Sequence, residues 1–349
     1  MSFQTLDQSM KLGVPLPTLA RVAVVIPCYR VSRQILPLLA LIGPEATHIY
    51  VVDDCCPDRT GDLVERGSAD PRVVVLRHER NRGVGGAMIT GFRRALADGA
   101  DIVVKLDGDG QMDPTLLPQF LAPIAWGQAD YVKGNRFFNM EDVKGMPKGR
   151  ILGNVALSFI TKLSTGYWSL FDPNNGYVAI DARVLARMPL DKVAERYFFE
   201  SDMLFRLNTL RARVLDLPMQ AVYAGEPSSL NPLRSIPTFL GRHMRNFGKR
   251  IVYNYFLRDF SLATLELVFG ALLLMFGIAF GAFTWIENGM ADRITSSGTV
   301  MLAVLPIMSG LQLLLAFVGF DMANVPSEPI APLLRKAGAL PRPFPAQTE

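Results

Sequence analysis

The sequence predicts an α/β fold with a mostly parallel sheet and helices on both faces, followed by an amphipathic helix and a hairpin of two membrane-spanning helices. Short apolar runs rich in β-branched residues alternate with helical patterns over the first two thirds of the chain. Two later runs are apolar over about the 20 residues that a helix needs to cross a bilayer. Only 19% of the 349 residues are charged, against roughly 25% in ordinary soluble domains, so we expect part of the chain to face lipid.

Four strands are expected in the amino-terminal part. Their runs are RVAVVIP, HIYVVDD, RVVVLRH and DIVVKL, with helical patterns at 32–42 and 85–97 among them. Because the carboxyl ends of parallel strands meet at one edge of the sheet, ligands bind beyond that edge. The polar residues that follow these runs, Tyr29, Asp53–Asp54 and Asp107–Asp109, should therefore converge on one crevice.

The rest of the chain divides by composition. Residues 137–149 are polar and aperiodic and should form a loop, a helix is expected over 151–164, and 172–220 return to mixed α/β character. We expect five segments, namely a flexible arm at 1–20, the α/β domain at 21–235, a basic amphipathic helix at 236–260, a transmembrane hairpin at 261–322 and a tail at 323–349.

The hairpin consists of two apolar runs, 262–285 and 299–320, joined by a short polar loop. A buried core helix is the alternative interpretation, which the length and low polarity of both runs disfavour. Basic residues flank the hairpin on its outer sides, at Arg242, Arg245, Lys249, Arg250, Arg258, Arg335, Lys336 and Arg342, whereas the loop carries only Arg293. By the positive-inside rule, we expect both termini and the α/β domain on the cytoplasmic side of the inner membrane.

The segment before the hairpin has the pattern of a basic amphipathic helix. One face carries Leu240, Met244, Phe247 and Ile251, and the opposite face carries Arg242, Arg245 and Lys249. Next to a membrane span, this pattern favours seating among membrane lipids. A helix packed on the α/β domain with a solvated charged face is the alternative, and the two interpretations are compatible.

Cysteine spacing argues against a zinc site, and the mild net charge argues against a nucleic-acid partner. Cys28, Cys55 and Cys56 have no spacing typical of zinc sites, so we expect reduced thiols. Without a His/Cys cluster, His48 and His243 are expected to be non-catalytic. The net charge of +4 is mild, and we expect no nucleic-acid partner. A homo-oligomer is left open.

The strongest chemical signal is Asp107-Gly108-Asp109 with Gln111, directly after the fourth strand. Two carboxylates one residue apart in a turn can share a divalent cation with a diphosphate. Mg²⁺ and Mn²⁺ prefer oxygen ligands and often keep substrate phosphates among them. Such a cation neutralises the charge that develops on a leaving nucleoside diphosphate, so we expect Mg²⁺ or Mn²⁺ as the cofactor.

A glycine-rich stretch, NRGVGGA at 81–87, precedes the helix at 85–97. The dinucleotide-binding fingerprint GxGxxG fails here, because counting from Gly83 the sixth position is Met88. We interpret these glycines as allowing close backbone packing near a nucleotide.

Taken in order, VVIPCYR, VVDDCCPDRTGDL, NRGVGGAMITGFRRAL and KLDGDGQMDPTLL resemble family 2 glycosyltransferases, as do the later GNRF, FDPNNGYVAID and YFFESDMLFRL. The resemblance covers about residues 21–260 and is strongest to the dolichol-phosphate mannosyltransferase and bactoprenol glucosyltransferase branch. It implies a GT-A fold and an inverting transfer. Arg30-Val31 stand where the family often has Asn-Glu.

The resemblance also implies roles for individual residues. Pro27, Tyr29, Asp53 and Asp54 would hold the nucleotide, Asp107 would contact nucleotide and metal, and Asp109 and Gln111 would be metal ligands. The acceptor phosphate would meet Arg136, with Lys148 or Arg150. Asp202 stands where related transferases place a base, and for a phosphate acceptor we expect it to position substrate.

These expectations combine into one function, the transfer of a sugar from a UDP- or GDP-linked donor to a polyprenyl phosphate. Two other readings stay open. A polymerising synthase usually carries a Q-x-x-R-W motif, and no Trp here follows an Arg. A non-catalytic nucleotide-binding membrane scaffold would not need the intact Asp107, Asp109 and Gln111 group. The sugar and the exact lipid are not predicted.

Overall fold

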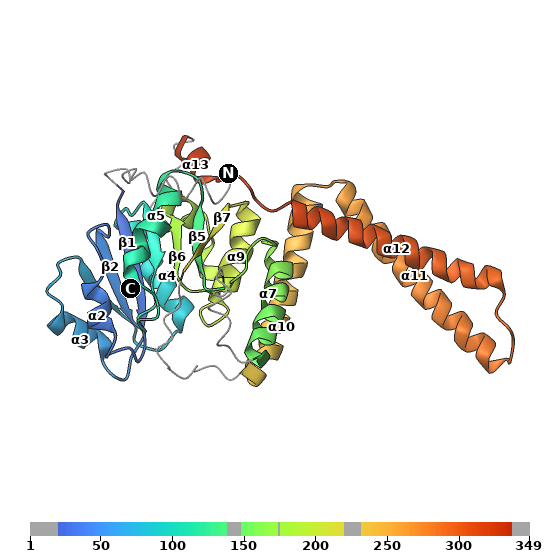
Figure 1. Ribbon diagram of the computed structural model, residues 1–349, viewed down its shortest axis with the longest axis horizontal. Coiled ribbons are helices and arrows are strands. Elements are labelled where there is room, and N and C mark those ends of the chain that lie inside the picture. The colour runs from blue at the N-terminus through green and yellow to red at the C-terminus, as the bar shows by residue number, and fades with distance from the viewer. Residues whose placement is uncertain (1–19, 138–147, 174, 220–231, 337–349) are drawn as a thin grey trace. The chain divides into compact units, whose positions relative to one another are not determined.

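The computed structural model describes residues 20–137, 148–173, 175–219 and 232–336 (Figure 1). Within these ranges, the side chains of 148–152 and 232–235 are not described. The chain divides into two compact units, Met1–Asn246 with Pro326–Glu349, and Phe247–Val325.

The first unit is built on a seven-stranded sheet with strand order β3-β2-β1-β4-β6-β5-β7. The strands are β1 (Val22–Cys28), β2 (His48–Asp53), β3 (Val73–Arg77), β4 (Ile102–Lys105), β5 (Tyr131–Asn135), β6 (Val178–Asp181) and β7 (Val214–Pro218). β1 to β4 are mutually parallel, β7 is parallel to β5, and β6 runs antiparallel between β4 and β5. The four strands expected from sequence are confirmed to within one residue at either end, and so is the mostly parallel sheet.

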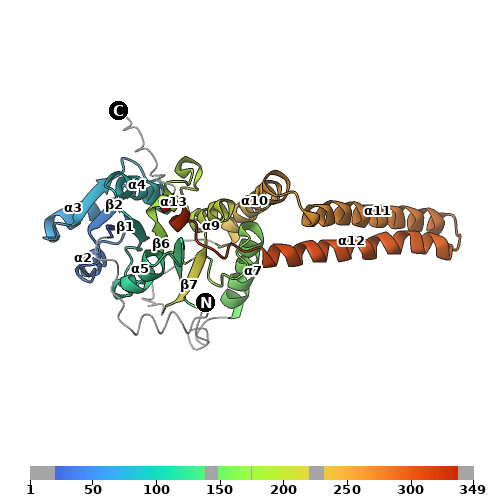
Figure 2. The same cartoon turned by 90° about the horizontal axis from the view of Figure 1, so that it is seen from above.

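Helices cover both faces of this sheet (Figure 2). The described helices before β7 are α2 (Ile35–Ala40), α3 (Thr60–Gly67), α4 (Val84–Ala97), α5 (Leu117–Ala125), α7 (Lys148–Thr165), α8 (Ala182–Leu185) and α9 (Phe199–Leu210), with 3₁₀ turns η1 (Pro114–Leu116) and η2 (Leu190–Lys192). Val24 and Ile26 pack with α2, α3 and α5 in one core cluster. Val25 points to the other face, where Gly91 lets α4 approach so closely that a Cβ there would collide with it.

The helix α10 (Pro232–Ile251) packs on the α/β domain through polar side chains and through Phe239, whose ring centroid lies 5.7 Å from that of Phe198. His243 Nδ1 lies 2.7 Å from Ser164 Oγ, and Asn246 donates to Asp202 Oδ1 at 3.1 Å. Both His243 and Asn246 are buried. A buried histidine with a hydroxyl partner agrees with a structural role.

The first half of the apolar face expected on this helix is exposed, whereas Ile251 at the other end of that face is buried. Leu240 is 45% exposed and Met244 is 55% exposed, and Ile236 continues the same row. The reason is that the buried row is offset by one position and is polar, so the apolar row is left outside. The chain thus presents an uncovered apolar row beside basic residues.

The segment after the hairpin belongs to the α/β unit. It contains α13 (Ala331–Lys336). The backbone amides of Ile330 and Ala331 donate to Asp130 at 2.9 and 2.7 Å, and Arg213 N donates to the same carboxylate at 2.8 Å. Asp130 is fully buried just before β5, and burial raises the pKa of its carboxyl. The segment expected as a tail at 323–349 therefore includes residues that dock on the α/β domain.

The second unit contains a π-helical turn η3 (Val252–Arg258) and the long helices α11 (Leu262–Met290) and α12 (Ser297–Ala323). Both long helices have a mean hydropathy of 2.2 and, by length and composition, could cross a membrane. Glycines form their contact: a Cβ on Gly277 would lie 2.8 Å from Ala303 O, and one on Gly310 would lie 2.8 Å from Gly270 O. Small residues of this kind let membrane helices approach closely.

A buried ion pair joins α10 to α12 within this unit. Arg250 donates to both oxygens of Asp321, at 2.5 and 2.9 Å, and Tyr255 Oη donates to Asp321 Oδ1 at 2.6 Å. A carboxylate this deeply buried in an apolar helix is stable only when paired. The contact ties the end of α10 to the end of α12.

Candidate functional site

The carboxyl ends of β1, β2 and β4 come together as the sequence predicts. Cys28 at the end of β1 is in register with Asp53 at the end of β2. On the other side, a Cβ placed on Gly108 would lie 3.3 Å from Cys28 Sγ. The Asp107–Asp109 turn therefore sits over the end of β1, next to the Asp53–Asp54 turn.

Asp53 shapes the turn that follows β2. Its carboxylate accepts hydrogen bonds from Cys56 N at 2.7 Å and Gly61 N at 2.6 Å. A Cβ on Gly61 would lie 2.8 Å from Asp53 Oδ2, so only glycine fits that position without a shift. The side chain thus holds the backbone between β2 and α3.

Asp54 anchors a second loop. It accepts from Arg82 N at 2.8 Å and Gly83 N at 2.7 Å, and its Oδ1 lies 2.7 Å from His78 Nδ1. The other ring nitrogen of His78 lies 2.8 Å from Thr90 Oγ1. His78 was not predicted as a site residue, although it follows the third strand at the same sheet edge as the other polar residues.

The glycine-rich stretch packs against backbone, as expected, and its partner is the segment 194–196. Gly86 N donates to Glu195 O at 2.9 Å. A Cβ on Gly83 would lie 2.8 Å from Glu195 O, and one on Gly85 would collide with Ala194 O. Glycine is required at these positions by loop-on-loop contact.

Asp107 is held by a buried lysine. Lys105 Nζ lies 2.6 Å from Asp107 Oδ1 and 3.3 Å from Glu200 Oε1. Burial lowers the pKa of Lys105, but Asp107 and Glu200 outweigh burial and raise it above the ordinary lysine value. Burial raises the pKa of Glu200, an effect that Lys105 opposes. The lysine is therefore a cation held between two carboxylates.

Asp109 and Gln111 stand on the same turn. Asp109 Oδ1 accepts from Gln111 N at 3.0 Å, and both side chains are partly exposed. Two carboxylates and an amide oxygen are the hard ligands that Mg²⁺ and Mn²⁺ prefer. Among the described residues, no group of three or more His, Cys, Asp or Glu side chains could hold a metal, so a metal here would need further oxygens from a bound diphosphate.

Arg136 lies at the end of β5 and pairs with Asp172. Burial raises the pKa of the Asp172 carboxyl, but Arg136 outweighs burial and keeps it below the ordinary value. Asn175 Nδ2 donates to Asp172 at 3.3 Å, and Gly176 crowds Asp107 so closely that a Cβ would collide with its carboxylate. Asp172, Asn175 and Gly176 thus connect the Arg136 pair to Asp107.

Lys148 and Arg150, the other two cations expected at the acceptor phosphate, open α7. Their side chains lie outside the described residues.

Asp202 has a structural role in this arrangement. Its carboxylate accepts from Ala194 N at 3.0 Å, from Arg206 at 3.0 and 3.1 Å, and from Asn246 at 3.1 Å. Three of these donors share Oδ2, and Oδ1 accepts from Asn246, so the carboxylate fastens the neighbouring segments to α9. Glu200, two residues earlier and so on the opposite side of α9, is the acid that faces Asp107.

An aromatic surface lies beside Arg136 and consists of Phe137, Phe159, Trp168 and Phe171. The ring centroids of Phe137 and Phe171 are 6.2 Å apart, and those of Phe159 and Trp168 are 6.1 Å apart. Phe159 is 58% exposed and Phe171 is 54% exposed. Lys162 Nζ lies 5.6 Å from the Phe171 ring centroid. Exposed aromatic rings beside cations are typical of surfaces that bind a partner or ligand.

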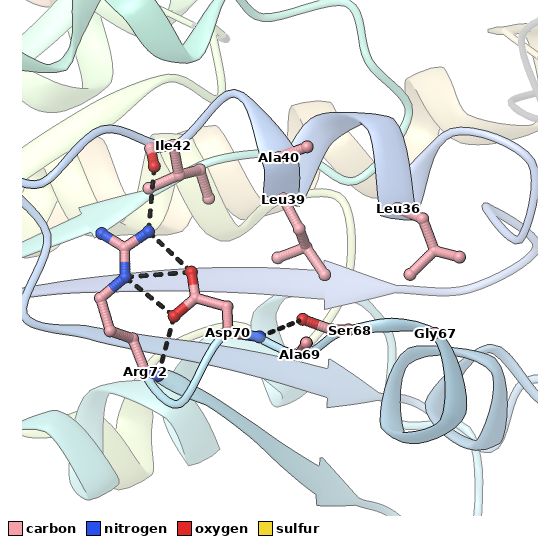
Figure 3. Close-up of a pocket in the computed structure, with 9 residues that line it drawn as sticks. All are labelled: Leu36, Leu39, Ala40, Ile42, Gly67, Ser68, Ala69, Asp70 and Arg72. Carbon is pink, nitrogen blue, oxygen red and sulfur yellow. Dashed lines mark hydrogen bonds and ion pairs between the residues drawn. The ribbon is translucent and has the colours of Figure 1, made fainter.

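A separate cavity of about 240 Å³ lies at the amino ends of β2 and β3, away from these carboxylates (Figure 3). Arg72 lines it and donates to Asp70 and to the carbonyl oxygens of Ile42, Gly43 and Ala46. Its guanidinium is thus used to fasten the loop between α2 and β2.

These features indicate the class of enzyme to which the chain belongs. A mostly parallel sheet with an Asp-x-Asp turn at the end of its central strand is the arrangement of GT-A glycosyltransferases. Mannosyl-3-phosphoglycerate synthase from Rubrobacter xylanophilus superposes with a TM-score of 0.51 at 17% identity, covering 73% of this chain and 80% of that chain. Glucosyl-3-phosphoglycerate synthase from Mycobacterium tuberculosis, in complex with Mn²⁺, UDP and phosphoglyceric acid, gives 0.50 at 19% identity, covering 71% and 82%. At these identities the likeness confirms the fold.

The sequence relatives give the family. Residues 23–188 match the profile described as "Glycosyl transferase family 2". The undecaprenyl-phosphate mannosyltransferase of Micrococcus luteus is 36% identical over 58% of this chain and 84% of its own length. The UDP-N-acetylglucosamine–dolichyl-phosphate N-acetylglucosaminyltransferase of Methanococcus voltae is 30% identical over 57% and 84%. The chain belongs to family 2 of the glycosyltransferases, in its polyprenyl-phosphate branch.

Proposed function

We propose that this enzyme transfers a sugar, with inversion, from a UDP- or GDP-linked donor to a polyprenyl phosphate at the cytoplasmic face of the membrane. The observation that carries the proposal is the link between two charged groups through Asp172, Asn175 and Gly176. Arg136, a cation suited to a phosphate, stands at one end, and Asp107, a carboxylate suited to a metal-bound diphosphate, stands at the other. Donor and acceptor phosphates would thus be held close together.

On the donor side, Pro27, Tyr29, Asp53 and Asp54 would form the nucleotide site. Tyr29 is 44% exposed at the end of β1, so its ring is available to a base. Because both aspartates hold the loops around that position, their contribution would be to shape it. Asp107, Asp109 and Gln111 would hold Mg²⁺ or Mn²⁺, which when bound neutralises charge on the leaving diphosphate.

On the acceptor side, the reaction needs residues that bind the acceptor phosphate more than it needs a base that activates it. A phosphate monoester has a second pKa near 6 and carries about −1.5 to −2 charge at pH 7, so it is already a nucleophile. Arg136, with Lys148 or Arg150, would hold it, since Arg binds phosphate in a two-pronged geometry. Asp202 would act by positioning the 194–196 segment, consistent with the hydrogen bond that Ala194 N donates to it.

Apolar surface on the α/β domain is evidence in favour of an acceptor with a lipid part. The aromatic surface adjoins Arg136 directly, because Phe137 follows it in sequence and Phe171 precedes Asp172. A cation next to exposed aromatic rings suits an anionic head with an apolar chain. A water-soluble acceptor would not need such a surface.

The proposed orientation also has support. Pro326–Lys336 follow the second long helix and dock on the α/β unit through Asp130. Both ends of the hairpin would then emerge on the side of the α/β domain, and the flanking basic residues favour the cytoplasm for that side.

Release of nucleoside diphosphate tests this function against its rivals. The purified protein would be incubated with a panel of UDP- and GDP-sugars, with polyprenyl phosphate, polyprenol or a soluble oligosaccharide. We expect release only with the lipid phosphate. Release with the oligosaccharide would favour a polymerising synthase, and no release under any condition would favour a scaffold.

A further inference from the structure

A fully buried lysine in a central strand requires an explanation. Lys105 is the last residue of β4, and 1% of its surface is exposed. The other residues of this strand are aliphatic, and lysine is almost never fully buried unless it is paired. We therefore expect a lysine at this position to be paired with a specific acidic side chain.

The Lys105 ammonium contacts two carboxylates and one carbonyl oxygen, and these contacts restrict its movement. The ammonium lies 2.6 Å from Asp107 Oδ1, 3.3 Å from Glu200 Oε1 and 3.3 Å from Gly176 O. Gly176 has no room for a side chain, because a Cβ there would collide with Lys105 Nζ and with Asp107 Oδ2. The ammonium thus has three acceptors at fixed positions, one of which belongs to the Asp-x-Asp turn.

The two oxygens of Asp107 are consequently not equivalent. Oδ1 is committed to Lys105, whereas within the part of the chain that the structure describes Oδ2 accepts no hydrogen bond. The Asp107 side chain is 29% exposed, and that of Glu200 is 15% exposed. Of the two carboxylates on the lysine, Asp107 is the one more open to a ligand.

We propose that Lys105 is a positioning residue, which locks Asp107 so that only Oδ2 is offered to the donor diphosphate and its metal, and that Glu200 is the countercharge that keeps Lys105 in place. This inference rests on the function proposed above. Partners that orient a metal ligand typically affect metal affinity by about 10- to 100-fold when they are removed. The competing explanation is that Lys105 only neutralises Glu200 in the protein interior.

Paired variants separate these explanations. Lys105→Met alone leaves Glu200 buried without its cation, and we expect a lowered melting temperature. Lys105→Met combined with Glu200→Gln removes both charges and keeps similar side-chain volumes, so we expect the melting temperature to return close to that of the wild type. Lys192→Met removes a lysine with an exposed side chain and serves as the control for charge.

The decisive readout is Mn²⁺ binding in the presence of UDP, measured by titration calorimetry on the full-length protein in detergent. If Lys105 positions Asp107, the double variant binds Mn²⁺ about 10- to 100-fold more weakly than the wild type and needs more donor to reach half of its maximal rate, although it is folded. Wild-type Mn²⁺ affinity in the folded double variant would overturn the proposal. If the proposed function is wrong, the wild type fails to transfer sugar to lipid phosphate, and the Mn²⁺ titration still tests Lys105.

Discussion

The guanidinium of Arg136 and the carboxylate of Asp172 form a two-pronged ion pair, with Nε 2.8 Å from Oδ2 and Nη2 3.1 Å from Oδ1. The Asp172 side chain is 3% exposed, whereas that of Arg136 is 30% exposed. The buried partner thus fixes the arginine while leaving part of it accessible. An acceptor phosphate would share a cation that is already oriented.

This geometry predicts a loss of acceptor binding in Arg136→Ala. A hydrogen bond to a charged group contributes about 1.5–3 kcal/mol, so kcat/KM for the lipid phosphate should fall about 10- to 100-fold with donor saturating. Arg136→Lys should recover only part, because a point charge cannot reproduce the two-pronged contact. The matched control is Arg183→Ala, which breaks a similar pair with Asp181 elsewhere in the fold. An equal loss of kcat/KM in the control would contradict the role of Arg136.

The metal assignment predicts that Asp109→Ala lowers turnover by about a hundredfold or more, since a group that stabilises charge in the transition state is lost. EDTA should have the same effect on the wild type, and added Mg²⁺ or Mn²⁺ should reverse it. Asp113→Ser is the control, because Asp113 caps η1 through Thr115 N and a serine can keep that cap. Full activity of the wild type in EDTA would exclude the metal.

The close contact of α11 and α12 predicts that Gly310→Val destabilises the hairpin. A Cβ at this position would lie 2.6 Å from Leu274 N, and overpacking of this kind typically costs about 1–3 kcal/mol. Thermal unfolding in detergent measures the effect. Gly319→Val adds the same side chain where no heavy atom lies within 4 Å, and it should be neutral. Equal melting temperatures for the two variants would refute this packing.

The orientation predicts opposite labelling of two exposed positions. In intact cells, a cysteine in Ser297→Cys, at the start of α12, should react with an impermeant thiol reagent, whereas one in Ser327→Cys should react only after permeabilisation. Cys55 is exposed, so both variants are made with Cys55→Ser. The reverse pattern would put the α/β domain outside the cytoplasm.

The sequence predicts the strands, the sheet edge and the Asp-x-Asp turn because each depends on local pattern. Buried runs such as VAVVIPC need only neighbouring residues to be recognised, and the carboxyl ends of parallel strands coincide by topology. The prediction of helices and apolar spans in the last third holds for the same reason.

The pairings that define the site are long-range and could not be read from local pattern. Lys105 meets Glu200 across 95 positions of sequence, and Asp130 meets Ala331 across 201. His243 and Asn246 on the inner row of α10 are polar because their partners Ser164 and Asp202 are polar, and periodicity alone assigns such residues to solvent. A charged residue at the end of an otherwise aliphatic strand, as Lys105 is, remains a sequence signal for this kind of pairing.

The most direct test of the central claim is the mass of the lipid product. Purified enzyme would be incubated with its nucleotide-sugar, Mg²⁺ and undecaprenyl phosphate, and the lipids would be analysed by mass spectrometry. We expect a product with one sugar residue and one phosphate on each lipid, formed together with nucleoside diphosphate. A lipid carrying two phosphates, a chain of several sugars, or unchanged undecaprenyl phosphate with every UDP- and GDP-sugar would contradict it.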